Sequence, residues 1–284
     1  MNTWVLITGA SRGLGKELAH TFWKAGYQLL LVSRQPPSCE EFQKPQLDVS
    51  DQKIKSFSCD LACAEDLEQL LRKLEPFGAE IDVLINNAAI QGPIGEFVNN
   101  DAVQWKQTLE VNLMSPSKIS QWVGKHMKAK KLGTIINLSG GGATGPRPNF
   151  SAYATAKAGL VRFSETLAEE LKTYNVSVNC IAPGAMPTEM LRQVLLAGPV
   201  DSGDAEYEKA RELFAEGQGS TQQVTDLALF LASDQGRRIT GKLISALWDN
   251  WEEWPNHMEE LQQSDVYSLR RITGRDRGMQ WGDK

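Results

Sequence analysis

Strand-length apolar runs alternate with longer segments of helical periodicity along most of the chain, and this alternation restricts the possible folds most strongly. It predicts parallel strands joined by right-handed helical crossovers. We therefore expect an α/β fold, a three-layer doubly wound parallel sheet of about seven strands (Rossmann-type) with helices on both faces. The expected strands are Trp4–Thr8, Tyr27–Ser33, Lys55–Cys59, Ile81–Ile85, Thr134–Leu138, Val176–Ile181 and Lys242–Leu247, and the expected helices are Leu14–Gly26, Glu65–Leu74, Asp101–Lys130, Ser151–Tyr174 and Thr221–Ala232.

No Gly/Ser-rich linker divides the chain, so we predict one catalytic domain over residues 1–248, with a substrate lid within it at 185–220. The charged, tryptophan-rich residues 249–284 are expected to be a C-terminal extension with no domain of their own. Pro36, Pro37 and Pro45 make a regular helix between Gln35 and Asp51 improbable, and we expect irregular structure there.

Composition narrows the class of protein. Of 284 residues, 41% are hydrophobic and 23% charged, which is ordinary for a globular protein, and the net charge of −5 argues against nucleic acid as a partner. No apolar run reaches the roughly 20 residues of a membrane span, and no secretion signal precedes the first strand, so we expect a cytoplasmic protein without a membrane partner. The four cysteines match no zinc spacing, so we expect free thiols and no metal.

A glycine-rich turn, Thr8-Gly9-Ala10-Ser11-Arg12-Gly13-Leu14-Gly15, follows the first strand and opens the first helix. Glycines here permit a tight turn and let the backbone approach a pyrophosphate, while the helix N-terminus offers free N–H groups. The position after a strand and before a helix favours dinucleotide binding. The alternative interpretation is a tight turn that holds no ligand.

The spacing Thr-Gly-x-x-x-Gly-x-Gly resembles the signature of the short-chain dehydrogenase/reductase (SDR) family, in its single-domain Rossmann-fold branch. Further similar motifs follow in the family's order over about residues 3–247: Asp60-Leu61, Asn86-Asn87-Ala88-Ala89, where alanine replaces the family's last glycine, Pro183-Gly184 with Thr188, and Ile239-Thr240-Gly241-Lys242. The resemblance implies a nicotinamide cofactor held by Gly9, Ser11, Arg12, Gly13, Leu14, Gly15, Ser33, Arg34, Asp60, Leu61, Asn87, Ala88, Tyr153, Lys157, Pro183, Gly184 and Thr188.

The end of the second strand, Val32-Ser33-Arg34, bears on the choice of cofactor. A carboxylate there would bind a ribose 2′-hydroxyl and repel a 2′-phosphate, but this segment has none. Arg34 can hold a phosphate through paired N–H donors, and Arg12 can add a second cation. We therefore predict a preference for NADP(H). The alternative is that Arg34 is a solvated loop residue and that NAD(H) is used.

Tyr153 and Lys157 are four residues apart in an expected helix, which puts them on one face, one turn apart. A free tyrosine has a pKa near ~10, and we expect the Lys157 ammonium to lower the pKa of Tyr153. Ser139 ends a strand, where ligands of open parallel sheets bind, and its hydroxyl can donate to a substrate carbonyl. By resemblance, Asn112, Ser139, Tyr153 and Lys157 are the catalytic residues, with Asn112 anchoring a water that connects Lys157 to solvent.

The resemblance implies an enzyme that transfers a hydride between NADP(H) and a carbonyl or secondary alcohol, with Tyr153 giving or taking the proton. Its partners would be a small-molecule carbonyl or alcohol substrate and further copies of itself, in a homodimer or homotetramer. A redox sensor that binds NADP without turnover is one alternative. A sugar epimerase or dehydratase of the longer SDR branch is another, although the glycine spacing and the absence of a larger C-terminal substrate domain argue against it.

Two segments depart from the family's pattern. Residues 140–148 are rich in glycine, which either leaves room for a bulky substrate or marks a mobile loop. The extension carries Arg270, Arg271, Arg275, Arg277 and Trp281. It either forms an anion site for a nucleotide-linked substrate such as a sugar nucleotide, or packs on its own domain or a partner subunit.

Overall fold

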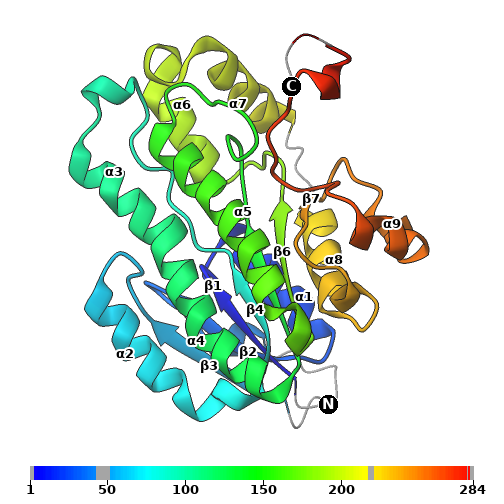
Figure 1. Cartoon of the computed structure of the whole chain (residues 1–284). Coiled ribbons are helices and arrows are strands. Elements are labelled where there is room, and N and C mark those ends of the chain that lie inside the picture. The colour runs from blue at the N-terminus through cyan, green and yellow to red at the C-terminus, as the bar shows by residue number, and fades with distance from the viewer. Residues whose placement is uncertain (1–2, 43–51, 217–220, 280, 282–284) are drawn as a thin grey trace.

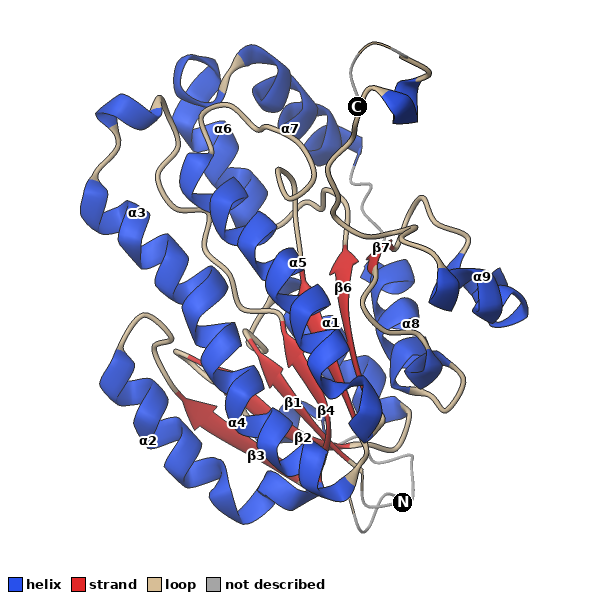
Figure 2. Cartoon of the chain, viewed as in Figure 1, coloured by secondary structure: helices blue, strands red, loops and turns tan. Residues whose placement is uncertain are grey.

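The fold was analysed in a computed structural model, which describes residues 3–42, 52–216, 221–279 and 281. Seven parallel strands form one sheet in the order β3-β2-β1-β4-β5-β6-β7, with helices on both faces (Figures 1 and 2). This confirms the predicted fold class. The strands are β1 Trp4–Thr8, β2 Gln28–Ser33, β3 Ile54–Ser58, β4 Ile81–Asn86, β5 Gly133–Leu138, β6 Val176–Ala182 and β7 Leu243–Ser245.

The helices agree with the sequence periodicity, apart from a break in the longest one and two helices in the lid. They are α1 Gly13–Lys24, α2 Ala64–Leu74, α3 Ala102–Leu109, α4 Ser115–Lys130, α5 Ser151–Leu171, α6 Glu189–Ser202, α7 Asp204–Glu216, α8 Thr221–Ala232 and α9 Met258–Gln263. The expected helix 101–130 contains one π-helical turn, Glu110–Met114, between α3 and α4. Of the expected irregular stretch 35–51, residues 43–51 lie outside the described part, and Cys39–Phe42 form a short 3-10 helix.

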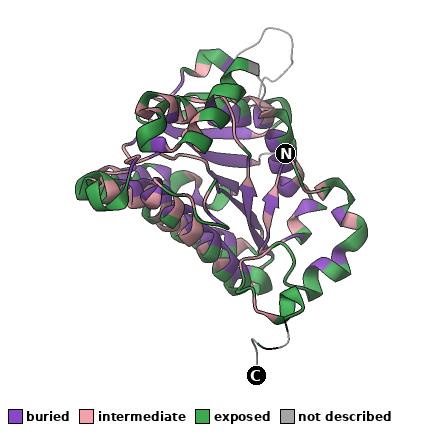
Figure 3. Cartoon of the chain, turned by 90° about the horizontal axis from the view of Figure 1, so that it is seen from above, coloured by how far each residue is buried: buried purple, intermediate pink, exposed green. Residues whose placement is uncertain are grey.

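Alternating side chains of the strands supply the two apolar cores, one on each face of the sheet. On β1, Trp4 and Leu6 pack with α2, α4 and α5, whereas Val5 and Ile7 pack with α1 and α8. Side chains of a strand alternate between the two faces, so a strand buried on both faces reads as continuously apolar. Figure 3 shows these buried strands between helices whose outer faces are exposed.

The segment 185–220, expected to be a substrate lid, contains two helices, α6 and α7, that were not predicted from the sequence. The sequence predicted only a polar, glycine-interrupted stretch there, of which 217–220 lie outside the described residues. Gly198 has a φ of +76° and precedes Pro199, and this kink interrupts the apolar periodicity of α6. Lid residues Val194 and Ala210 are buried against Phe150, beside α5. The lid therefore lies over the segment that leads into α5.

The C-terminal extension folds back on its own domain beyond β7 (Figure 1). Its residues Trp254, Met258 and Leu261 are buried in the same core as α1 and α8. The Trp254 ring stacks on Tyr267 with 4.4 Å between centroids. The contacts fit the packing interpretation of the extension. They place the segment from Trp254 to Leu261 against the domain's core.

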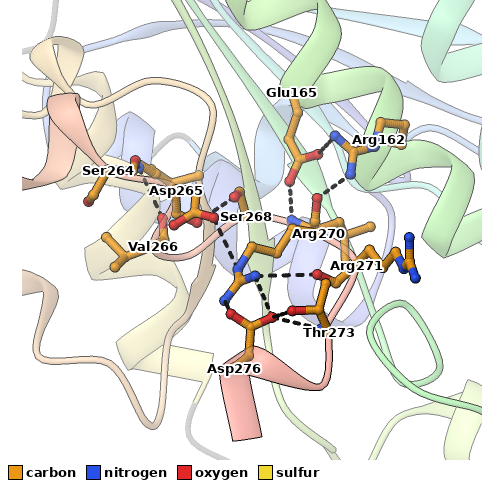
Figure 4. Close-up of polar contacts among 12 residues, drawn as sticks. Arg162, Glu165, Ser264, Asp265, Val266, Ser268, Arg270, Arg271, Thr273 and Asp276 are labelled. Carbon is orange, nitrogen blue, oxygen red and sulfur yellow. Dashed lines mark hydrogen bonds and ion pairs between the residues drawn. The ribbon is translucent and has the colours of Figure 1, made fainter. Parts of the chain in front are cut away.

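A backbone carbonyl and a side-chain carboxylate of the extension also close the outer edge of the sheet. The N–H of Leu243 donates to the Tyr267 carbonyl at 2.8 Å, and that of Ser245 donates to Asp249 Oδ2 at 2.7 Å. On α5, Glu165 accepts from the N–H of Leu269, and Arg162 donates to the carbonyl of the same residue (Figure 4). Unpaired N–H groups on an edge strand invite pairing with another chain, and here the outward donors of β7 have internal acceptors.

Packing of the extension predicts a contrast between its tryptophans. Replacing Trp254, which is 5% exposed, by Ala should cost roughly 3–5 kcal/mol of unfolding free energy because it leaves a cavity in the core. Trp281→Ala is the matched control, since Trp281 is 86% exposed and should change stability by less than about 0.5 kcal/mol. Urea unfolding measures both; equal effects would contradict the docked arrangement.

Candidate active site

A cleft of about 1150 Å³ lies at the carboxyl ends of the strands, between the glycine turn, the loop after β5 and the lid. All the predicted cofactor-binding residues and Ser139 line it, and Asn112 is not among its lining residues. Parallel strands end at the same edge of a sheet, so residues distant in sequence meet there. Five further residues were not predicted from the sequence as site residues: Thr8, Arg147, Glu206, Lys209 and Trp248, all of which except Thr8 line this cleft.

Close backbone packing makes glycine necessary in the turn after β1. A Cβ on Gly15 would lie 2.1 Å from the carbonyl oxygen of Gly9, and one on Gly9 would lie 2.8 Å from Ala88 Cα. Gly9 and Gly13 also have φ values of +70° and +53°, which favour glycine. No side chain caps the N-terminus of α1. Its first N–H groups can therefore bind an anion, and the turn fits the diphosphate of a nicotinamide cofactor.

Thr8 connects the glycine turn to the segment after β4. Its Oγ1 accepts hydrogen bonds from the N–H groups of Asn87 and Ala88, both at 3.1 Å. In return, the Asn87 side-chain amide donates to the carbonyl oxygens of Thr8 and Gly9 at 3.0 and 3.3 Å. Through these hydrogen bonds, the predicted residues Asn87 and Ala88 attach the segment after β4 to the glycine turn. The threonine that begins the glycine motif was the available sequence signal for this contact.

The residues at the ends of β2 and β3 form another wall of the cleft. Ser33 Oγ is buried and has no hydrogen-bond partner, while Arg34 and Arg12 are exposed and have no ion-pair partner within the described residues. Asp60 Oδ1 accepts from the N–H of Ala62 at 3.0 Å, which fixes the turn that carries Leu61. The two free guanidiniums leave this wall positively charged.

Tyr153 and Lys157 lie on the face of α5 that points into the cleft, and both are buried. Lys157 Nζ donates to the carbonyl oxygen of Leu138 at 2.6 Å, which ties α5 to the end of β5. Ser139 Oγ is buried without a hydrogen-bond partner. A Cβ on the next residue, Gly140, would lie 2.3 Å from the Tyr153 hydroxyl oxygen. The phenol therefore lies beside the backbone that follows Ser139, and both residues line the cleft.

Asn112 is fully buried in the π-helical turn Glu110–Met114. Its Oδ1 accepts from the N–H of Ile90 at 2.9 Å, and its Nδ2 donates to the Ile90 carbonyl at 2.8 Å. Both ends of the amide thus hold the loop after β4. In this structure, Asn112 fixes the backbone beside the cleft. The water-anchoring role implied by the resemblance stays a prediction.

Burial dominates the acid–base properties of the pair on α5. It raises the pKa of Tyr153 to about 12, with Arg147 acting in the opposite direction, and it lowers the pKa of Lys157 to about 8. The expected lowering of the tyrosine pKa by Lys157 was therefore wrong for this structure. The ammonium lies 5.7 Å from the centroid of the Tyr153 ring and donates to Leu138 instead. The phenol is neutral at physiological pH and can donate a proton.

Arg147 anchors the glycine-rich loop 140–148, which the sequence analysis described only as roomy or mobile. Its guanidinium makes two hydrogen bonds to the Glu206 carboxylate of α7, at 3.0 and 2.7 Å. It also lies 3.8 Å above the ring centroid of Phe150. The partner residues are 59 positions apart, so local sequence gave no signal for the pair.

The arginines of the extension do not line the cleft. Arg270 is held by Asp265 and Asp276, at 3.0 and 2.9 Å, and this pairing keeps the pKa of Asp276 well below its usual range (Figure 4). The hypothesis of an anion site in the extension therefore gains no support from the placement of Arg270. In the described part of the chain no cluster of metal-ligating side chains occurs, and no helix there is long and apolar enough to cross a membrane.

Comparison with known proteins gives a consistent result. The sequence model of the short chain dehydrogenase family matches residues 3–197. Human dehydrogenase/reductase SDR family member 4 is 26% identical over 86% of this chain and 85% of its own length. The 3-oxoacyl-(acyl-carrier-protein) reductase FabG of Salmonella typhimurium is 30% identical over 84% of this chain and 93% of its own. Among solved structures, levodione reductase is 26% identical and has a TM-score of 0.73, with 86% of this chain and 95% of that chain covered.

The buried ammonium predicts a pH dependence of stability that does not require turnover. Because the pKa of Lys157 is lowered from 10.5 to about 8, the unfolded chain binds more protons between these values, so stability should rise with pH in this window. Between pH 7.5 and 9.5 the gain should be about 2 kcal/mol. Measuring the unfolding free energy of wild type and of Lys157→Met at both pH values isolates the contribution of Lys157 to this gain. If the difference in unfolding free energy between the two proteins is the same at both pH values, burial does not lower the pKa of Lys157.

Proposed function

Because the chain belongs to the short-chain dehydrogenase/reductase family, NAD(P)-dependent oxidoreductases that act on CH–OH and C=O groups, we propose that it transfers a hydride between NADP(H) and a carbonyl or secondary alcohol. Tyr153 is the acid or base of this reaction. The observation that carries the proposal is the presence of a buried, unpartnered Ser139 hydroxyl and a neutral Tyr153 phenol in the same cleft, which the glycine turn also lines. A reductase substrate needs both of these donors at its oxygen.

The residues of the chain have separate tasks in this proposal. The bound cofactor supplies the hydride in reduction and accepts it in oxidation. Ser139 donates a hydrogen bond to the substrate oxygen, where negative charge develops, and Tyr153 transfers its proton to the same oxygen. Lys157 fixes α5 against β5 through Leu138 and has donors left for a cofactor ribose. The glycine turn and Thr188, which both line the cleft, hold the cofactor.

The tyrosine assignment can be tested by one substitution. Tyr153→Phe removes only the hydroxyl, so carbonyl reduction should fall by at least about a hundredfold, the scale of a lost general acid, while NADPH still binds. Stopped-flow NADPH oxidation and isothermal titration measure the two properties. Tyr174→Phe, on the 3-10 helix after α5, is the matched control. Normal turnover by Tyr153→Phe would disprove the assignment.

NADP(H) is the proposed cofactor because Arg34 at the end of β2 and Arg12 in the glycine turn both line the cleft, and the end of β2 presents no carboxylate. The paired N–H donors of Arg34 would bind a 2′-phosphate. With a cofactor that lacks this phosphate, they would have no partner. Among similar solved structures, one is an NADPH-dependent reductase and another a xylitol dehydrogenase with NAD⁺ bound. Since these similar structures use different cofactors, the proposed preference for NADP(H) rests on Arg34 and Arg12 of this chain.

Arg34→Ala should weaken NADPH binding about tenfold or more and leave NADH binding nearly unchanged, because only the 2′-phosphate contact is lost. Isothermal titration of both cofactors gives the ratio of dissociation constants. Arg277→Ala, an exposed arginine of the extension outside the cleft, controls for loss of one charge. Equal weakening of NADPH and NADH by Arg34→Ala would refute the preference.

Assembly as a homodimer or homotetramer remains part of the proposal. The internal pairing of the β7 edge with residues 249 and 267 takes up the N–H donors that another chain would need there. We expect subunits to meet through other faces of the domain. Among the candidates, the segment around α3 and α4 exposes Val103 and Met114.

A further inference from the structure

The substrate half of the cleft contains one arginine that is held in a fixed position near the proposed proton donor. The Arg147 side chain is only 14% exposed and is held flat over Phe150, with 3.8 Å to the ring centroid. Its guanidinium carbon lies 5.8 Å from the centroid of the Tyr153 ring. A planar guanidinium held in this way is preorganised for a carboxylate or a phosphate. Its position makes it available to a substrate bound beside Tyr153.

The partner of Arg147, Glu206, lies on helix α7 and lines the same cleft. Glu206 on α7 supplies both oxygens to the guanidinium, and its side chain is 33% exposed. Lys209 follows three residues later on α7, lines the same cleft, is exposed and has no ion-pair partner among the described residues. Glu189, the other lid carboxylate at the cleft, lies 3.6 Å from Arg192. Arg147, Lys209 and Glu206 together therefore carry one net positive charge.

Building on the proposed reductase function, we propose that Arg147 and Lys209 form a subsite for an oxyanion of the substrate, a carboxylate or a phosphate, for which Glu206 is the internal substitute. Exchanging one oxyanion for another preserves the paired, charge-assisted hydrogen bonds of Arg147, so displacing Glu206 costs little. The nearby Lys209 then balances the incoming charge. A neutral substrate leaves the Arg147–Glu206 pair intact and gains nothing from it. The subsite thus selects anionic substrates over neutral ones.

The short distance between Arg147 and Tyr153 also limits the class of substrate. An anionic group on Arg147 and a carbonyl at the Tyr153 hydroxyl must belong to one small part of the molecule. Oxo acids and phosphorylated ketones satisfy this requirement. Side chains at the glycines between them would press on both residues, since a Cβ on Gly140 would lie 2.3 Å from the Tyr153 hydroxyl oxygen and one on Gly142 would lie 3.2 Å from Arg147 Cβ.

Matched substrate pairs test the subsite. Turnover with NADPH would be compared for acetoacetate and acetoacetamide, and for dihydroxyacetone phosphate and dihydroxyacetone. We expect kcat/KM to favour the anionic member of at least one pair by about tenfold or more, as for one charge-assisted contact that the neutral member lacks. The pair that shows the preference identifies the oxyanion. Equal kcat/KM values within both pairs would overturn the proposal.

Two substitutions with opposite expected effects distinguish a substrate subsite from a latch, an ion pair that only fastens α7 to the loop after β5. Arg147→Gln should reduce the anionic-to-neutral ratio of kcat/KM about tenfold. Glu206→Gln should raise the same ratio, because the internal competitor is gone. The matched controls are Arg211→Gln and Glu208→Gln, both on α7, which should leave the ratio as in wild type, since neither residue lines the cleft and they pair with each other. A latch predicts that both changes at the pair act in the same direction, and that result would refute the subsite.

Anion binding without turnover distinguishes failure of the subsite from failure of the proposed reductase function. Acetate and inorganic phosphate would be titrated calorimetrically into the NADPH-loaded protein, in which the cofactor occupies the Arg34 side. Binding of either anion should tighten in Glu206→Gln and weaken in Arg147→Gln. Unchanged binding in both variants would overturn the subsite. Lack of NADPH and NADH oxidation with every substrate would contradict the reductase function and leave the anion titration to decide.

Discussion

The contact between the backbones of Gly9 and Gly15 is the constraint on which the arrangement of the site depends. No Cβ fits at Gly15, because it would lie 2.1 Å from the Gly9 carbonyl oxygen. This closeness lets α1 begin directly beyond β1, so that the helix N-terminus faces the edge where the other strands end. Asn87 and Thr8 then attach the segment after β4 to the same turn. A side chain at Gly15 would move the turn, the helix and that segment together.

Much of this arrangement could be predicted from sequence because it follows from local patterns. Continuous apolar runs mark strands buried on both faces, and glycines mark the turn. The lid helices α6 and α7 were missed because Gly198 and Pro199 break the periodicity and few lid residues reach a core. The Arg147–Glu206 pair and the docking of Tyr267 on β7 join residues far apart in sequence. No local pattern records such contacts.

The site also shows how burial and charge oppose one another on one helix. Removal of water raises the pKa of Tyr153 and lowers that of Lys157, so the same surroundings favour the uncharged form of both. The sequence analysis assigned the tyrosine a cationic neighbour from spacing alone. Spacing places two side chains on one face, but it does not say which acceptor the ammonium will choose. Here that acceptor is the last carbonyl of β5.

The extension beyond β7 has a consequence for the order in which the domain can form. Trp254, Met258 and Leu261 fill part of the core around α1, although they are synthesised more than 200 residues after it. A ribosome-bound chain that ends before them has a gap in this core and an open edge on β7. Domains generally fold as units, and incomplete units expose apolar surface and strand edges. The nascent protein therefore depends on residues 249–267 to complete the core and close the sheet.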